Sequence, residues 1–162
     1  MTALEFAIQM ELDGEKYYLE QAEKNKDNNL YTVFKILADE ERVHAEILEK
    51  HAKEIEYEMD ESAAYTEFQN VFVSLDDFNV ETKAAPDQLD GYRLALQKEQ
   101  ESIDLYEKML AEAKRDEDRV LFEFLVEQEK IHYQVFDDII QHLIKAEQWV
   151  EDAEFGRRME EY

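Results

Sequence analysis

Two histidines of this chain each follow a glutamate by three residues, and a second glutamate lies thirty residues before each of these pairs. The set comprises Glu11, Glu41, His44, Glu99, Glu129 and His132. Residues three apart on a helix share a face, so each pair would present a carboxylate and an imidazole together. Such oxygen and nitrogen ligands suit iron, with manganese as the alternative. The pattern predicts a site for two metal ions, with iron as the expected metal.

The ligand pattern occurs twice because the chain contains an internal repeat. Residues 3 to 56 align with residues 91 to 144 at an offset of 88 without a gap. The four glutamates and two histidines pair with each other at this offset, and Tyr18 pairs with Tyr106. His51 and His142 lack the preceding glutamate, and we interpret both as ordinary helix histidines. The doubled arrangement is typical of di-metal carboxylate bundles.

Four helices are expected to carry these residues. The chain has only three Gly and one Pro in 162 residues and is rich in helix formers, which predicts an all-α protein. The expected helices span residues 3–25, 29–57, 87–114 and 117–146, giving hairpins 3–57 and 87–146. Polar turns separate the helices of each hairpin, and Pro86 marks the start of the third helix.

A long connection joins the two hairpins. Residues 58–86 are too many for a tight turn and contain apolar stretches, so this segment is expected to pack on the bundle as a crossover. One long crossover is the connection found in ferritin-like four-helix bundles, and residues 1–146 are predicted to form one. The tail, residues 147–162, contains Trp149 and Phe155 and is predicted to be either a short docking helix or an oligomer contact.

Apolar stripes place the six residues in the predicted core. In the first helix the stripe is expected at Leu4, Ile8, Leu12 and Leu19, with Glu11 on or beside it. Similar stripes surround the other glutamates and histidines. Four buried carboxylates repel one another, and no lysine or arginine lies on the stripes, so protons or cations must compensate. Two divalent cations would balance the four negative charges, which makes bound metal the simplest explanation.

Two tyrosines recur beside the predicted ligands. Tyr18 and Tyr106 follow Glu11 and Glu99 by seven residues, which is two helical turns. Each hydroxyl is expected to reach a ligand carboxylate or a channel near the site, and core packing is the alternative.

Composition excludes several classes of function. The formal net charge is −24, from 42 acidic and 18 basic side chains, which opposes binding to nucleic acids and to anionic membranes. The absence of cysteine excludes disulfides, iron–sulfur clusters and thiolate zinc sites on this chain. No segment resembles a signal peptide or a membrane span, so a cytoplasmic location is expected.

Taken together, four motifs resemble the rubrerythrin branch of the ferritin-like superfamily. They are MELDGEKYY at 10–18, EERVHA at 40–45, KEQESIDLY at 98–106 and QEKIHY at 128–133. The resemblance implies a di-iron centre in which Glu41 and Glu129 bridge the metals. It also implies that Glu11 and Glu99 are terminal ligands and that one histidine completes each coordination sphere.

Two departures from the family affect the expected chemistry. Rubrerythrins typically carry a rubredoxin-like module with a four-cysteine iron site, which this cysteine-free chain lacks, so its electrons would come from a separate donor protein. The family also has a further glutamate one turn after the third-helix ligand, where this chain has Ser102. The expected function is an oxidoreductase that reduces peroxide or dioxygen in oxidative-stress defence. The alternative is iron handling or ferroxidase-type storage, and a homodimer or small homo-oligomer is expected.

Overall fold

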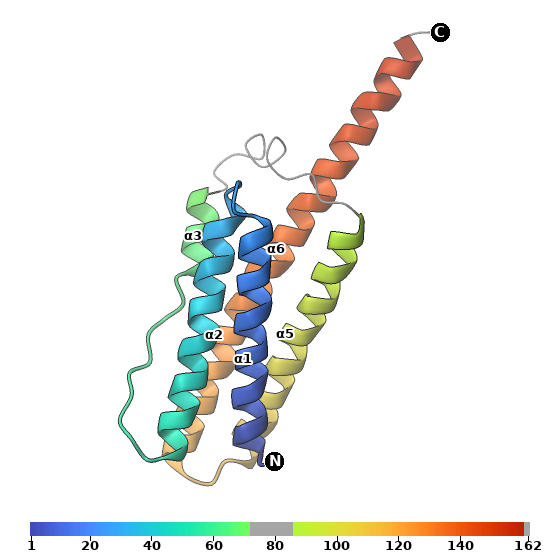
Figure 1. The fold of residues 1–162 in the computed structure, drawn as a ribbon. Helices are drawn as coiled ribbons and strands as arrows, with labels where there is room; N and C mark the ends of the chain where they lie inside the picture. The colour runs from blue at the N-terminus through green and yellow to red at the C-terminus, as the bar shows by residue number, and fades with distance from the viewer. Residues whose placement is uncertain (72–85, 161–162) are drawn as a thin grey trace.

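The computed structural model describes residues 1–71 and 86–160, and these residues form two helical hairpins and one short additional helix (Figure 1). The helices are α1 (Ala3–Lys24), α2 (Leu30–Ala52), α3 (Ala64–Val71), α5 (Pro86–Glu112) and α6 (Asp116–Glu160). Close backbone approaches lie mainly within the pairs α1–α2 and α5–α6, and the two pairs lie side by side (Figure 1). The predicted all-α four-helix bundle is confirmed.

The polar site described below forms a layer between two apolar clusters. One cluster contains Tyr18, Phe34, Leu37, Tyr92, Phe136 and Ile139 among others. The other contains Ala7, Leu48, Tyr106, Leu121 and Leu125 among others. Each of the four long helices contributes to both clusters and passes through the polar layer between them. The apolar clusters therefore fix the level at which the helices present their polar residues.

The buried face of α1 differs from the predicted stripe. Ala7, Glu11 and Tyr18 are buried, whereas Leu12 and Leu19 are more than a third exposed. The apolar stripe therefore flanks the buried face, and Glu11 lies at the centre of that face. Sequence periodicity was misleading here because the most apolar residues of α1 border the core, whereas the buried positions hold small or polar side chains, namely Ala7, Glu11, Tyr18, Gln21 and Ala22.

The second helix ends earlier than the predicted residue 57. The backbone N–H of Ile55 donates to the carbonyl oxygen of Lys50 at 2.8 Å, and that of Glu54 donates to His51 at 3.2 Å. These bonds form a Schellman motif, in which the residue after the cap adopts a left-handed conformation. Glu54 takes that position with φ of 56°. Glycine usually occupies it, so the sequence carried no signal for this helix end.

The fourth helix ends later than predicted. Helix α6 continues without interruption to Glu160, so residue 146 is not a helix end and the tail is not a separate docking helix. The last turns extend past the other helices (Figure 1), and Phe155 is exposed. The side chain of Trp149 lies outside the described residues.

The connection between the hairpins is partly described. Its helix α3 lies against α2 and α6, and Ala64 and Phe68 join one of the apolar clusters. This much of the predicted packing of the crossover is confirmed, and residues 72–85 lie outside the described residues. Within the ranges that the structure covers, no helix has the length and apolarity needed to span a membrane.

Candidate metal centre

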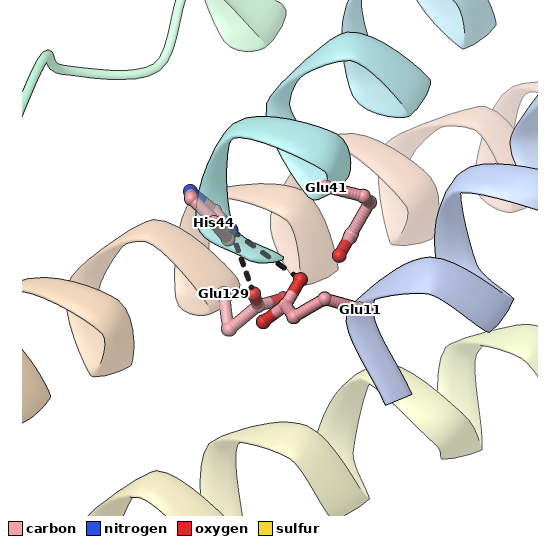
Figure 2. A group of neighbouring side chains, drawn as sticks. All are labelled: Glu11, Glu41, His44 and Glu129. Atoms are coloured by element: carbon pink, nitrogen blue, oxygen red, sulfur yellow. Dashed lines mark hydrogen bonds and ion pairs between the residues drawn. The ribbon is translucent and has the colours of Figure 1, made fainter. Parts of the chain in front are cut away.

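All six predicted ligands are buried and meet in the polar layer of the bundle. They form two groups of four, in each of which one ligand atom per residue lies within 4.8 Å of the others. The first group contains Glu11, Glu41, His44 and Glu129 (Figure 2). The second contains Glu41, Glu99, Glu129 and His132. The structure therefore brings together every residue that the sequence singled out.

The two groups share Glu41 and Glu129. These residues come from α2 and α6, so each hairpin contributes one carboxylate to both groups. A shared carboxylate has two oxygens and can serve two cations at once. Glu11 and Glu99 each belong to one group only. This arrangement has the form expected for two bridging and two terminal carboxylates.

The histidines cross between the hairpins. His44 Nδ1 lies 3.1 Å from Glu129 Oε1 and 3.5 Å from Glu11 Oε2, the two contacts drawn in Figure 2. His132 Nδ1 lies 3.0 Å from Glu41 Oε1. Their rings stack with centroids 5.5 Å apart. In both cases the Nδ1 atom faces the carboxylates, so Nδ1 is the nitrogen available to a metal.

The tyrosines also cross, in a way that the sequence did not specify. The hydroxyl of Tyr18 on α1 donates to Glu99 Oε1 on α5. The hydroxyl of Tyr106 on α5 donates to Glu11 Oε1 on α1 at 2.5 Å. Both rings are fully buried. Each tyrosine therefore reaches the carboxylate of a predicted ligand, and in both cases that glutamate belongs to the other hairpin.

Glu40 is a residue of the site that sequence reasoning missed. Its Oε1 lies 3.5 Å from His132 Nε2, the nitrogen on the far side of the ring from the carboxylate cluster. The Ser62 hydroxyl, from the crossover, donates to Glu40. The counterpart of Glu40 in the repeat is Gln128, which donates to Glu61 at 3.0 Å. Among the described residues, a carboxylate lies at the outer nitrogen of His132 and none at that of His44, so the two half-sites differ.

The remaining histidines lie elsewhere, as predicted. His51 contacts the Tyr57 hydroxyl at 2.8 Å and Asp118 at 2.7 Å, which ties the segment after α2 to the start of α6. His142 Nδ1 contacts the backbone oxygen of Asp138 at 2.7 Å. Both contacts are structural.

Burial and mutual repulsion force protons onto the metal-free cluster. Burial, together with neighbouring carboxylates, raises the pKa of Glu41 and of Glu99 well above the usual value, and raises that of Glu129 to about 7. Burial also opposes ionisation of Glu11, but its bond to Glu41 and the charge of His44 outweigh this and lower its pKa to about 2. For His44, the acidic partners outweigh burial and raise the pKa to about 10.

Unsatisfied atoms show that the site suits divalent cations. Glu11 Oε2 and Glu99 Oε2 are buried and have no hydrogen-bond partner among the described residues. Two divalent cations would balance four carboxylates and would bind these two oxygens together with Nδ1 of His44 and of His132. The donor set of carboxylates and imidazoles fits iron or manganese.

Comparison with known protein families identifies a match to the family described as Rubrerythrin over residues 2–140. The chain belongs to the rubrerythrin family. The matched region contains all six clustered residues and both tyrosines, so the family assignment rests on the part of the chain that builds the centre. Searches of curated proteins and of solved structures returned no match.

The chain differs from the pattern expected for its family at Ser102. The side chain is buried one turn after Glu99 on α5, and its hydroxyl donates to the backbone oxygen of Lys98 at 3.0 Å. It also lies 3.2 Å from Met10 Sδ. At the position where the resemblance implies a carboxylate, this chain therefore has a small side chain bonded to its own helix.

Proposed function

We propose that this protein holds two iron ions and reduces a peroxide or dioxygen. The observation that carries the proposal is the pair of four-residue groups that share Glu41 and Glu129. A pair of ferrous ions in such a site supplies two electrons to an oxidant. Glu41 and Glu129 would hold both ions, Glu11 with His44 would complete one side, and Glu99 with His132 the other.

The residues around the ligands fit this role. Tyr18 and Tyr106 each keep a proton on a hydroxyl that bonds a terminal carboxylate, because burial raises the pKa of both tyrosines well above 10. They therefore fix the orientation of Glu99 and Glu11 without adding negative charge. The chain has no cysteine, so a separate donor protein would return the electrons. A cytoplasmic location and a small homo-oligomer remain part of the proposal.

Stopped-flow oxidation of the iron-loaded protein tests the proposal. We expect hydrogen peroxide to oxidise bound ferrous iron faster than free ferrous iron at the same pH. Glu41→Ala and Glu129→Ala should lose bound metal and activity together, whereas Glu123→Ala, an exposed position on α6, should keep both. Oxidation no faster than that of free iron would refute the redox function.

The acidic composition favours a second candidate, iron handling or storage. A net charge of −24 attracts cations, and the dinuclear site would then be an entry point for iron. Mineral storage requires a closed shell of many subunits. Light scattering separates the two candidates, since an assembly of only two chains cannot enclose a mineral core.

A further inference from the structure

Two consecutive residues of the crossover bond to the two helices that carry the shared carboxylates. The Ser62 hydroxyl donates to the Glu40 carboxylate on α2. Glu61 Oε2 accepts a hydrogen bond of 3.0 Å from the side-chain amide of Gln128 on α6. Glu40 and Gln128 each directly precede a shared carboxylate in the sequence. The crossover is therefore attached to α2 and α6 at the level of the candidate metal centre.

The two attachments differ in where they lead. Glu40 and Gln128 are equivalent in the repeat, but one is a carboxylate and the other is an amide. Glu40 Oε1 lies 3.5 Å from His132 Nε2, so the attachment through Ser62 continues to a candidate ligand. The side-chain nitrogen of Gln128 donates to Glu61 instead. The crossover thus reaches the His132 side of the centre through Ser62 and Glu40.

Glu40 needs a second partner to stay beside His132. Its side chain is 19% exposed and has access to water, whereas His132 is fully buried. At 3.5 Å the contact is longer than a hydrogen bond, and His132 Nε2 has no hydrogen-bond partner among the described residues. Rotation of Glu40 into water would leave this buried nitrogen without a carboxylate nearby. The bond from Ser62 opposes that rotation, because a hydrogen bond to a charged carboxylate is comparatively strong.

A carboxylate beside His132 Nε2 favours metal binding at the opposite nitrogen. Nδ1 faces the cluster and binds a cation only through its lone pair, so the proton of the neutral ring then resides on Nε2. A carboxylate that accepts a hydrogen bond from Nε2 fixes this tautomer and strengthens the imidazole as a ligand. A shift of about 0.5 Å would bring Glu40 to hydrogen-bond length. Within the described residues His44 has no such carboxylate at its outer nitrogen.

Ser62 also forms the start of α3. Its Oγ accepts a hydrogen bond of 3.2 Å from the backbone N–H of Ala64, the first residue of that helix. Ala64 and Phe68 are buried against α2 and α6. One hydroxyl therefore contacts both the first turn of α3 and the carboxylate that faces His132, so a movement of either partner affects the other.

We propose that Ser62 is a positioning residue for His132, that it makes the His132 half-site bind its metal ion first, and that it couples this binding to the order of the crossover. The proposal rests on metal binding by the six candidate ligands, which is part of the proposed function. The coupling is reciprocal, because the factor by which the Ser62 bond strengthens metal binding equals the factor by which the metal stabilises that bond. One hydrogen bond of this kind corresponds to roughly threefold to tenfold.

Calorimetric titration of the full-length protein with ferrous iron under anaerobic conditions tests the positioning role. Ser62→Ala should weaken one of the two metal-binding steps by roughly threefold to tenfold and leave the other unchanged. Ser62→Thr keeps a hydroxyl and should retain the wild-type affinity. Glu61→Ala is the matched control, because it removes the bond to Gln128 and leaves the bond from Ser62 to Glu40 in place. A selective loss of the same size in Glu61→Ala would overturn the proposal, because it would trace the effect to general loosening of the crossover.

A double-mutant cycle tests whether Ser62 acts through Glu40. In the Glu40→Ala variant, Ser62→Ala should cause no further loss of metal affinity, because the residue through which Ser62 acts is absent. Glu40 is a partly exposed helix residue, so Glu40→Ala should fold. An equal loss of affinity on Ser62→Ala in the wild type and in Glu40→Ala would overturn the positioning role.

Nitrogen-15 NMR of the histidine rings tests which half-site binds first. With one equivalent of zinc as a diamagnetic probe, the ring signals of His132 should shift before those of His44. In Ser62→Ala this preference for His132 should decrease. Equal shifts of both rings in the wild type, or an earlier shift of His44, would overturn the proposed order of binding.

Hydrogen exchange measures the reciprocal effect on the crossover. The backbone amide of Phe68 in α3 should exchange roughly threefold to tenfold more slowly in the metal-loaded wild type than in the presence of a chelator. Glu40→Ala retains the bond between Ala64 and Ser62, and in this variant the metal should no longer slow the exchange. Equal slowing in the wild type and in Glu40→Ala would overturn the coupling.

The outcomes separate this proposal from the proposed function. If the wild type binds no metal ion, both are refuted. If the wild type binds two ions and Ser62→Ala binds them with unchanged affinities, the role of Ser62 is refuted and the metal centre stands. Failure of hydrogen peroxide to oxidise bound ferrous iron refutes the redox function alone.

Discussion

Replacing Glu129 by glutamine should make the metal-free protein more stable at high pH and the metal-loaded protein less stable. Glu129 is buried, and its pKa in the folded chain is about 7 instead of 4.5. Because the folded-state value is raised, the stability that is present below pH 4.5 is lost as the pH rises through 7. Glutamine has nearly the same shape and carries no proton to lose.

The expected size of the stability change follows from the difference between the folded and unfolded pKa values of Glu129. Full ionisation of Glu129 costs the folded state about 3 kcal/mol, of which about 2.5 kcal/mol falls between pH 5 and pH 8. For a chain of this length that corresponds to a change of roughly 5–10 °C in the unfolding midpoint. With two divalent cations bound, the effect of Glu129→Gln on stability changes sign and the variant is the less stable protein, because glutamine removes the negative charge of a shared ligand.

Thermal unfolding with a chelator at pH 5 and pH 8 measures the effect. From pH 5 to pH 8 the unfolding midpoint of the wild type should fall by more than that of Glu129→Gln. The difference between these two decreases is the predicted quantity. Glu123→Gln changes an exposed glutamate on the same helix and should follow the wild type. If the unfolding midpoints of Glu129→Gln and the wild type changed equally with pH, ionisation of Glu129 would not be what destabilises the metal-free protein at high pH.

Three further predictions concern metal binding. Glu40→Gln should weaken one of the two metal-binding steps by roughly 10–100-fold in a calorimetric titration, because His132 loses the carboxylate at its outer nitrogen. Equal weakening of both steps would contradict the difference between the two half-sites. Gly14→Ala should weaken metal binding roughly tenfold without destabilising the metal-free helix, because the new Cβ would lie 3.2 Å from the Glu41 carboxylate. Gly91→Ala is the control and should leave the metal affinity unchanged, because a Cβ there would meet no atom within 4 Å. Metal binding near pH 6.5 should release protons, and the metal affinity should increase as the pH rises, because the raised pKa values leave protons on the cluster. Calorimetric titrations in buffers of different ionisation enthalpy measure this release, and equal binding enthalpies in all buffers would contradict it.

The site was more predictable from sequence than the helix ends were. The six candidate ligands were predictable because a repeat offset of 88 places the same residue types on the same faces twice, and because four buried glutamates need compensating protons or cations. Helix ends depend on local signals. The end of α2 at Ala52 uses Glu54 where glycine is usual, and no glycine or proline marks residue 146 inside α6.

Contacts between helices were the least predictable part. Periodicity indicates which face a side chain occupies but not which neighbouring helix it meets, so the crossed bonds of Tyr18 and Tyr106 could not be assigned. Glu40 was missed for a similar reason. It is adjacent in sequence to a ligand, and its role depends on Ser62, which lies in a segment without a repeat counterpart.

The crossed arrangement also affects how the chain holds together. Close backbone contacts are concentrated within each hairpin, whereas the shared carboxylates, both histidines and both tyrosines make contacts from one hairpin to the other. A bound pair of cations would therefore link the two hairpins to each other. Each hairpin supplies only part of either candidate coordination group, so bound cations would couple the unfolding of one half to that of the other and would make a duplicated chain behave as a single cooperative unit.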